Sequence, residues 1–284
     1  MNSILTFYVK SETSCTLEQF LRQEQGVSKR LITKLKRTNG LFCNDKPIRS
    51  IDPVKFGDIV TLHLSDNSVA LPSIETTVPV VLETSQFLIY NKPPDMPVHP
   101  SRNHYTDTLG NVFSSSFPEL PFRSVNRLDK NTSGLCVVAK NAHAVHILQK
   151  SMQKQYYAIV QGKILKSGTV NAPIAREHES IIKRCVRDDG KYAVTHYTPI
   201  YNTETYTLVK IKLETGRTHQ IRVHMSYIGY PLAGDEMYGG DCTHISRHAL
   251  HCTRVFLPAL ENNTSWITVS SELPDDMKKL INLA

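Results

Sequence analysis

Apolar and polar residues alternate in most of the periodic segments of this 284-residue chain, which predicts short β-strands. Regularly spaced crossover helices are missing from the pattern, so neither a dinucleotide-binding fold nor a barrel of alternating strands and helices is expected. We expect an α+β protein whose large domain holds a mixed, largely antiparallel sheet with flanking helices and loops. Its strands are predicted within 78–81, 87–90, 135–139, 154–162, 194–200, 205–215 and 247–255, and its helices near 109–114, 142–152 and 218–226.

Helical spacing stands out near the start of the chain. Thr16 followed by Gln19 is a capping-box pattern, and it predicts a first helix that ends at Gly26. Ser28 is the expected N-cap of a second helix, and residues 29–37 of that helix carry five cations and no acid. Such a charged face is either solvated surface or a binding surface for an anion.

Short strands complete a small α/β unit at the N-terminus. They are predicted within 1–10, 41–43, 46–49 and 56–64. Residues 66–77 then lose all periodicity and include Pro72, which indicates a linker. We therefore expect a small domain at 1–65 and a large domain at 78–284.

Composition narrows the class of protein further. Lys and Arg outnumber Asp and Glu by 33 to 26, a net charge of +7, which favours a polyanionic partner. Apolar stretches stay well below the roughly 18 residues of a membrane span, and the N-terminus lacks a signal-peptide pattern, so we expect a cytoplasmic protein. The six cysteines form no CxxC pair, and the His and Cys residues of 242–252 fall partly on a strand that would point neighbours to opposite faces, so no metal is expected.

Residues 126–140, NRLDKNTSGLCVVAK, combine a carboxylate with a buried strand. Asp129 precedes a small polar turn, Thr132 to Gly134, and the apolar run 135–139 follows. A rigid strand can hold such a carboxylate in place for chemistry. An aspartate that caps its own turn in solvent is the structural alternative.

This string resembles the signature of RNA pseudouridine synthases of the ribosomal large-subunit (RluA) type, in which HRLD is followed by two variable residues and TSGL. Seven positions match, namely Arg127, Leu128, Asp129, Thr132, Ser133, Gly134 and Leu135, whereas Asn126 stands where the family usually has His. The resemblance continues in KQYYAIVQG at 154–162 and LETGRTHQIRVH at 213–224. It also includes NKPPDMPVHP at 91–100, where Asp95 replaces a usual Gly, and it spans residue 78 to the C-terminus.

The resemblance implies a catalytic set of Asp129, Tyr156 and Arg222. Asp129 would be the nucleophile or base, Arg222 its paired cation, and Tyr156 the ring that stacks on the uracil. Arg127 would fill the space left by a flipped nucleotide, and Arg217, the less favoured partner of the carboxylate, would contact phosphate. Isomerisation of uridine involves no net redox change and no external group, so no cofactor is expected.

The N-terminal unit resembles an RNA-binding domain first described in a small-subunit ribosomal protein. This resemblance makes Lys29, Arg30, Lys34 and Arg37 RNA-binding candidates. The basic segment 173–197 is predicted to be a surface hairpin that contacts RNA, with a solvated loop as the alternative, and His99 is either structural or a proton-transfer group. We expect a monomeric enzyme that acts on ribosomal or transfer RNA. The alternatives are a non-catalytic RNA-binding or ribosome-assembly protein on the same fold and, less favoured, a nucleosidase.

Overall fold

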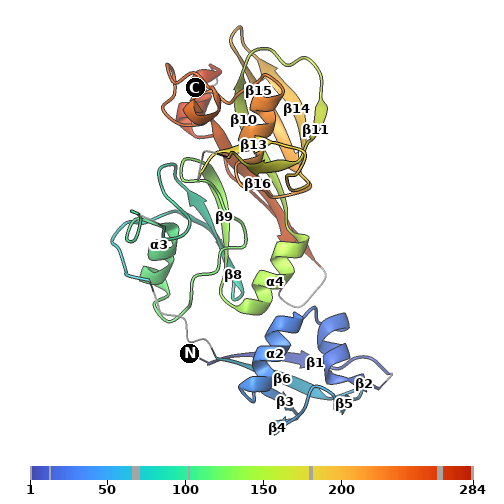
Figure 1. Cartoon of the computed structure of the whole chain (residues 1–284). Coiled ribbons are helices and arrows are strands. Elements are labelled where there is room, and N and C mark those ends of the chain that lie inside the picture. The colour runs from blue at the N-terminus through green and yellow to red at the C-terminus, as the bar shows by residue number, and fades with distance from the viewer. Residues whose placement is uncertain are drawn as a thin grey trace.

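Within the described residues, the two largest β-sheets have separate hydrophobic cores, two further two-stranded sheets accompany them, and the short helices lie against them (Figure 1). The computed structural model describes residues 2–12, 14–65, 71–101, 103–178, 182–260 and 265–282. Part of the expected linker, residues 66–70, thus lies outside the described residues. In the described part of the chain, no helix is long and apolar enough to cross a membrane.

The N-terminal sheet has four strands in the order β1-β6-β3-β4. They are β1 (Asn2–Tyr8), β3 (Leu41–Cys43), β4 (Lys46–Pro47) and β6 (Ile59–Ser65), and a separate pair is formed by β2 (Cys15–Thr16) and β5 (Pro53–Val54). The helix α2 (Lys29–Arg37) buries Leu31, Ile32 and Leu35 against β6 and leaves its cations outside. The strand predicted within residues 1–10 and the basic helix are therefore present, and the strand lies at the edge of this sheet.

The first predicted helix differs from expectation in its second half. The capping box forms, since Thr16 and Gln19 each bond to the other's backbone N–H, but α1 (Leu17–Gln19) continues as a π-helix, η1 (Phe20–Glu24). The widened turn buries Phe20 and Leu21 completely. Hydrophobic spacing does not distinguish these two helix types, so the π-helix was not foreseen.

The large sheet has the strand order β11-β14-β15-β10-β16-β9-β8-β7, with β17 paired to β16. Its strands are β7 (Val80–Glu83), β8 (Phe87–Lys92), β9 (Ser133–Ala139), β10 (Gln153–Gln161), β11 (Gly168–Asn171), β14 (Val194–Asn202), β15 (Tyr206–Leu213), β16 (Leu250–Pro258) and β17 (Trp266–Ser270). Every described strand pair in it is antiparallel except β9 with β16. The α+β class with a mixed, largely antiparallel sheet is thus confirmed.

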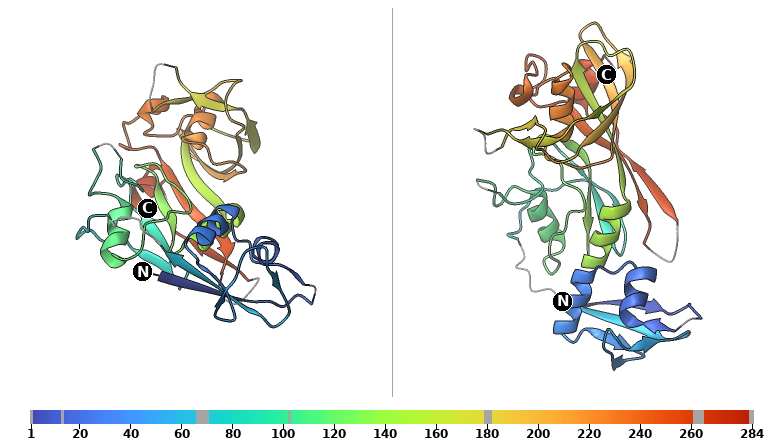
Figure 2. Two further views of the ribbon diagram at one scale, coloured as in Figure 1. Left: turned by 60° about the horizontal axis from the view of Figure 1, so that its bottom comes forward. Right: turned by 45° about the vertical axis from the view of Figure 1, so that its right-hand side comes forward.

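Helices and one hairpin surround this sheet (Figures 1 and 2). They are α3 (Leu109–Ser116), α4 (Ala142–Ser151), α5 (Gln220–Tyr227), η2 (Glu236–Tyr238), α6 (Asp275–Leu280) and the hairpin of β12 (Ile174–Arg176) with β13 (Arg184–Val186). In Figure 1 and in the right-hand view of Figure 2, α4 lies between the large sheet and the N-terminal unit, and the His143 ring of α4 meets the Phe7 ring with 5.5 Å between ring centres.

The parallel contact of β9 with β16 lies at the centre of the large sheet and depends on one glycine. Gly134 pairs with Cys252, has φ of +106°, and lies so close that a Cβ would sit 2.3 Å from the Cys252 carbonyl oxygen. No other residue fits this position without displacing β16. Asn126 extends the ladder, because its side chain donates to the Leu135 carbonyl and accepts from the Val137 N–H. Both ends of the turn that carries Asp129 are therefore fixed.

Candidate active site

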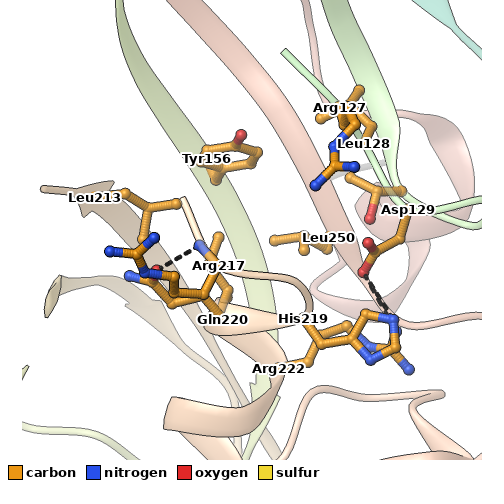
Figure 3. Close-up of a pocket in the computed structure, with 12 residues that line it drawn as sticks. Arg127, Leu128, Asp129, Tyr156, Leu213, Arg217, His219, Gln220, Arg222 and Leu250 are labelled. Atoms are coloured by element: carbon orange, nitrogen blue, oxygen red, sulfur yellow. Dashed lines mark hydrogen bonds and ion pairs between the residues drawn. The ribbon is translucent and has the colours of Figure 1, made fainter. Parts of the chain in front are cut away.

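The predicted catalytic residues come together around one pocket, at the place where the turn before β9 faces β10 and the start of α5 (Figure 3). Tyr156 lies across the pocket from Asp129. Apolar walls come from Leu128, Leu213 and Leu250. The full lining is Arg127, Leu128, Asp129, Thr132, Tyr156, Leu213, Arg217, His219, Gln220, Ile221, Arg222 and Leu250.

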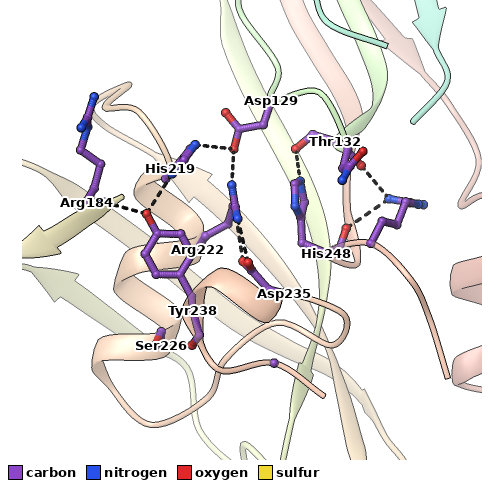
Figure 4. Close-up of polar contacts among 12 residues, drawn as sticks. Asp129, Thr132, Arg184, His219, Arg222, Ser226, Asp235, Tyr238 and His248 are labelled. Atoms are coloured by element: carbon purple, nitrogen blue, oxygen red, sulfur yellow. Dashed lines mark hydrogen bonds and ion pairs between the residues drawn. The ribbon is translucent and has the colours of Figure 1, made fainter. Parts of the chain in front are cut away.

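Two carboxylates share the buried guanidinium of Arg222 (Figure 4). Its Nε and Nη2 donate to the two oxygens of Asp235, each at 2.7 Å, and Nη1 donates to Oδ2 of Asp129 at 3.3 Å. Burial works to lower the pKa of Arg222, but the bonds to Asp235 and the charge of Asp129 outweigh it, and the pKa is raised. With one cation for two carboxylates, a negative charge is left over, and only Asp129 is exposed to the pocket.

His219 lies beside this ion pair. It is the residue that precedes α5 and adopts the left-handed conformation, with φ of 57°, and its ring faces Asp129. Nε2 lies 3.9 Å from Oδ2 of Asp129, and Nδ1 lies 2.8 Å from the Tyr238 hydroxyl, which also accepts the backbone N–H of Arg184. Burial lowers the pKa of His219. A neutral ring that accepts the Tyr238 proton at Nδ1 presents N–H to the carboxylate.

Asp235, His219 and Tyr238 also belong to this site, although the sequence patterns did not predict them as site residues. His219 is part of the TGRTHQIRVH segment, so its place between Arg217 and Arg222 could have indicated it as a site residue. Both Asp235 and Tyr238 follow α5 in the chain, Asp235 in a loop and Tyr238 in η2. The Tyr238 ring packs against Arg222, whose Cζ lies 4.9 Å from the centre of the ring. Nothing in the spacing of their sequence indicates that this loop folds back onto the ion pair.

Tyr156 is buried in the pocket wall, with 6% of its surface exposed. Burial first, then nearby thiols and the Asp129 carboxylate, raise its pKa well above the usual range. Its hydroxyl therefore carries its proton at neutral pH. The neighbour in sequence, Tyr157, points to the other face of β10, where it packs in a different hydrophobic cluster.

Further hydrogen bonds hold the turn that carries Asp129 in place. Thr132 shares a hydrogen bond of 2.8 Å with Nε2 of His248, and burial lowers the pKa of His248 to about 2, so that ring is neutral. Lys92 is buried and donates to the carbonyls of Pro93, Met96 and Lys130, at 2.7, 2.8 and 3.0 Å. Burial lowers the pKa of Lys92 to about 7. The segment after β8 is thereby tied to the residue that follows Asp129.

Other predicted residues lie outside the pocket. Lys29, Arg30, Lys34 and Arg37 are on α2 of the N-terminal unit, and Arg30 and Lys34 line a groove that also includes His99 and Arg123. The ring of His99 bonds to the Ser124 hydroxyl at 2.7 Å and is not part of the Asp129 pocket. Within the described ranges, no group of three or more His, Cys, Asp or Glu residues is placed to hold a metal ion.

Comparison with known proteins assigns this fold and pocket to a family. The family described as RNA pseudouridylate synthase matches residues 86–227, which include the turn of Asp129, the strand of Tyr156 and the helix of Arg222. The chain therefore belongs to the RNA pseudouridine synthases and is an isomerase.

Individual relatives agree with the large-subunit type. The chain is 37% identical over 273 residues to an uncharacterized RNA pseudouridine synthase, YjbO, of Bacillus subtilis, covering 91% of this chain and 95% of the relative. It is 39% identical to ribosomal large subunit pseudouridine synthase D of Pseudomonas aeruginosa, over 72% of this chain and 71% of the relative. The solved human RNA pseudouridylate synthase domain containing 1 superposes with a TM-score of 0.58 at 26% identity, over 78% of this chain and 89% of that structure.

Proposed function

We propose that the protein converts specific uridines of ribosomal or transfer RNA into pseudouridine, with Asp129 as the catalytic carboxylate. The observation that carries the proposal is the pocket in which Asp129, held by Arg222, faces the ring of Tyr156. Relatives named as ribosomal large subunit synthases favour ribosomal RNA over transfer RNA as the first substrate to test.

The reaction breaks the bond between C1′ of the ribose and N1 of the uracil, turns the detached base and forms a bond from C1′ to C5. The C5 proton is then lost to solvent, and N1 ends with a proton in its place. An ionised carboxylate serves as nucleophile or base in this sequence. The guanidinium of Arg222 pairs with the Asp129 carboxylate and orients it, and Asp235 orients Arg222 in turn. The protonated hydroxyl of Tyr156 and its ring position the uracil while the bond is broken.

A uridine within folded RNA reaches such a pocket only after it leaves its stack. Arg127 is exposed at the pocket rim and takes the place of the flipped nucleotide. Residues 1–65 act as an RNA-binding domain, joined by the linker 66–77 to the catalytic domain 78–284. The basic face of α2 supplies their contacts to phosphate. We further propose that the protein works as a monomer in the cytoplasm.

Replacement of Asp129 by Asn tests the function. The change keeps size and hydrogen-bonding shape but removes the charge, so RNA binding should persist while product formation becomes undetectable. The measurement is tritium release from bulk RNA labelled at C5 of uridine, with the fold of the variant checked by circular dichroism. Glu214→Gln is the matched control, since Glu214 pairs with His196 at 2.7 Å and lies outside the pocket lining.

Substantial release by folded Asp129→Asn protein would overturn the assignment of the carboxylate. If the wild-type protein binds RNA but releases no tritium from any RNA fraction, the non-catalytic RNA-binding alternative is favoured instead. Release of free uracil without pseudouridine would indicate a nucleosidase.

A further inference from the structure

A second pocket, rich in cations, adjoins the Asp129 pocket. Its lining includes Arg127 and Arg217, which line both pockets, and adds three more cations from the β12–β13 hairpin and the segment after it: Arg176, Arg184 and Lys191. Asp189 is its one acidic lining residue, and this carboxylate pairs with the guanidinium of Arg187. The pocket therefore has a strongly positive lining.

The frame of this pocket is rigid. Ile174 and Lys191 exchange two backbone hydrogen bonds of 2.9 Å, and Ile174 is buried in a cluster with Val223 of α5. Gly190 permits this approach, because a Cβ there would lie 2.6 Å from the Ile174 backbone. Nε of Arg217 donates to the Tyr192 carbonyl at 2.9 Å, which orients its guanidinium. The cations are thus presented by fixed backbone, which lowers the entropic cost of binding an anion.

The β12–β13 hairpin also contacts residues beside the Asp129 pocket. The backbone N–H of Arg184 donates to the Tyr238 hydroxyl at 2.9 Å, and that hydroxyl meets His219, whose other nitrogen faces Asp129. In Figure 4 the side chain of Arg184 extends away from this contact. One hairpin therefore supplies cations to the second pocket and supports the group beside the carboxylate.

We propose that this cationic pocket binds the phosphodiester backbone of the RNA next to the target uridine. The inference rests on the proposed function, because it takes the uracil to occupy the Asp129 pocket. A nucleotide whose base is there has a phosphate on each side, and the wall formed by Arg127 and Arg217 leads directly from one pocket to the other. Guanidinium groups bind phosphate oxygens through two parallel N–H bonds, which suits a pocket with four arginines.

The test removes the two exposed cations that line only the second pocket, in the double variant Arg176→Ala/Lys191→Ala. Their backbone contacts remain, and Arg184, whose N–H supports Tyr238, stays intact. Binding of a fluorescein-labelled decauridylate is measured between 0.1 and 1 M salt. Loss of two phosphate contacts should lower the slope of the logarithm of affinity against the logarithm of salt concentration by up to roughly 1.4. If the variant and the wild type bind equally at 1 M salt, the variant then binds up to roughly 25-fold more weakly at 0.1 M salt.

The matched control is Lys166→Ala/Lys279→Ala, which also lowers the net charge by two, from +7 to +5, but removes exposed cations outside both pockets. It should keep an affinity and a salt slope close to those of the wild type. Wild-type binding by Arg176→Ala/Lys191→Ala, or an equal loss in the control, overturns the proposal. So does displacement of decauridylate by polyglutamate as effective as displacement by unlabelled decauridylate, because the pocket would then take acidic peptide.

Tritium release by the wild-type protein from bulk RNA separates this inference from the proposed function. If the wild type releases no tritium, yet the double variant loses affinity and salt slope, the function fails and the phosphate site stands. If the wild type is active and the double variant keeps both its affinity and its KM, the site fails and the function stands. If the proposed function and the phosphate site are both correct, the Arg176→Ala/Lys191→Ala exchange should raise KM more than it lowers kcat.

Discussion

Removal of Arg222 should destabilise the protein far more than a surface arginine would, because it leaves Asp235 as an unpaired charge in the interior. The Asp235 side chain is 1% exposed, and among the described residues Arg222 is the only hydrogen-bond partner of its carboxylate, through two bonds of 2.7 Å. Breaking a buried pair from one side costs about 3 to 5 kcal/mol. We expect Arg222→Met to lose that amount of unfolding free energy.

The double variant Arg222→Met/Asp235→Leu separates the two contributions. It removes both charges and fills the space with apolar side chains, so most of the lost stability should return, to within about 1 kcal/mol of the wild type. Activity should not return, because Asp129 still lacks its cation. A restored fold without tritium release would therefore assign Arg222 a role in catalysis that stability does not explain.

Urea denaturation followed by Trp266 fluorescence measures the effect. Trp266 is the only tryptophan of the chain, lies on β17 of the large sheet and stacks on Phe256 at 4.6 Å between ring centres, so its signal reports unfolding of that sheet. A loss below 1 kcal/mol in Arg222→Met would refute the reasoning that Asp235 depends on this pair. A double variant as unstable as the single one would show that the cost comes from lost packing on Tyr238 instead.

Three further predictions concern the ring, the N-terminal helix and pH. Tyr156→Phe should keep RNA affinity but slow tritium release at least tenfold, about 1.4 kcal/mol in the barrier, and a fully active Phe variant would limit Tyr156 to stacking. Neutralising Arg30, Lys34 and Arg37 together should weaken RNA binding and lower its salt slope by up to roughly 0.7 per lost contact; wild-type values would make α2 ordinary solvated surface. Burial lowers the pKa of His248 to about 2 and of His251 to about 4, so the unfolded state binds more protons below pH 6.5. Unfolding free energy should therefore fall as pH drops from about 6.5 to 4.5, by up to about 1.4 kcal/mol per pH unit for each histidine, whereas a flat profile in urea denaturation would contradict their neutral burial.

Local pattern predicted many of the elements, because alternation and capping are local properties, but β11, β17 and α6 were not predicted. The basic helix, α4, the strand after Asp129 and the largely antiparallel sheet were all expected, with ends that differ by a few residues. A mixed sheet was expected, but the parallel pairing of β9 with β16 in particular was not, since it joins only two residue pairs more than a hundred positions apart. Alternation along either strand does not depend on the direction of its neighbour.

The site residues also divide into those that local motifs predict and those that depend on tertiary folding. The motifs predicted the residues that face the pocket, and the structure brings Arg127, Asp129, Tyr156, Arg217 and Arg222 together; their roles, like the domain boundaries, stay predictions. Asp235, which anchors Arg222 from a loop, depends on tertiary folding alone. The pairing of Arg222 with a second, buried carboxylate could not be read from residues that carry no regular spacing.

Asp95 is a departure from the family pattern that backbone geometry accounts for. It adopts φ of +59°, a conformation that glycine takes most easily and that Asp and Asn tolerate better than other residues. Its carboxylate pairs with Nζ of Lys130 at 3.0 Å, and the Lys130 carbonyl accepts the N–H of Met96 and the ammonium of Lys92. The substitution therefore exchanges the conformational freedom of a glycine for one more contact to the residue next to Asp129, so the loop still holds the turn that carries Asp129 in place.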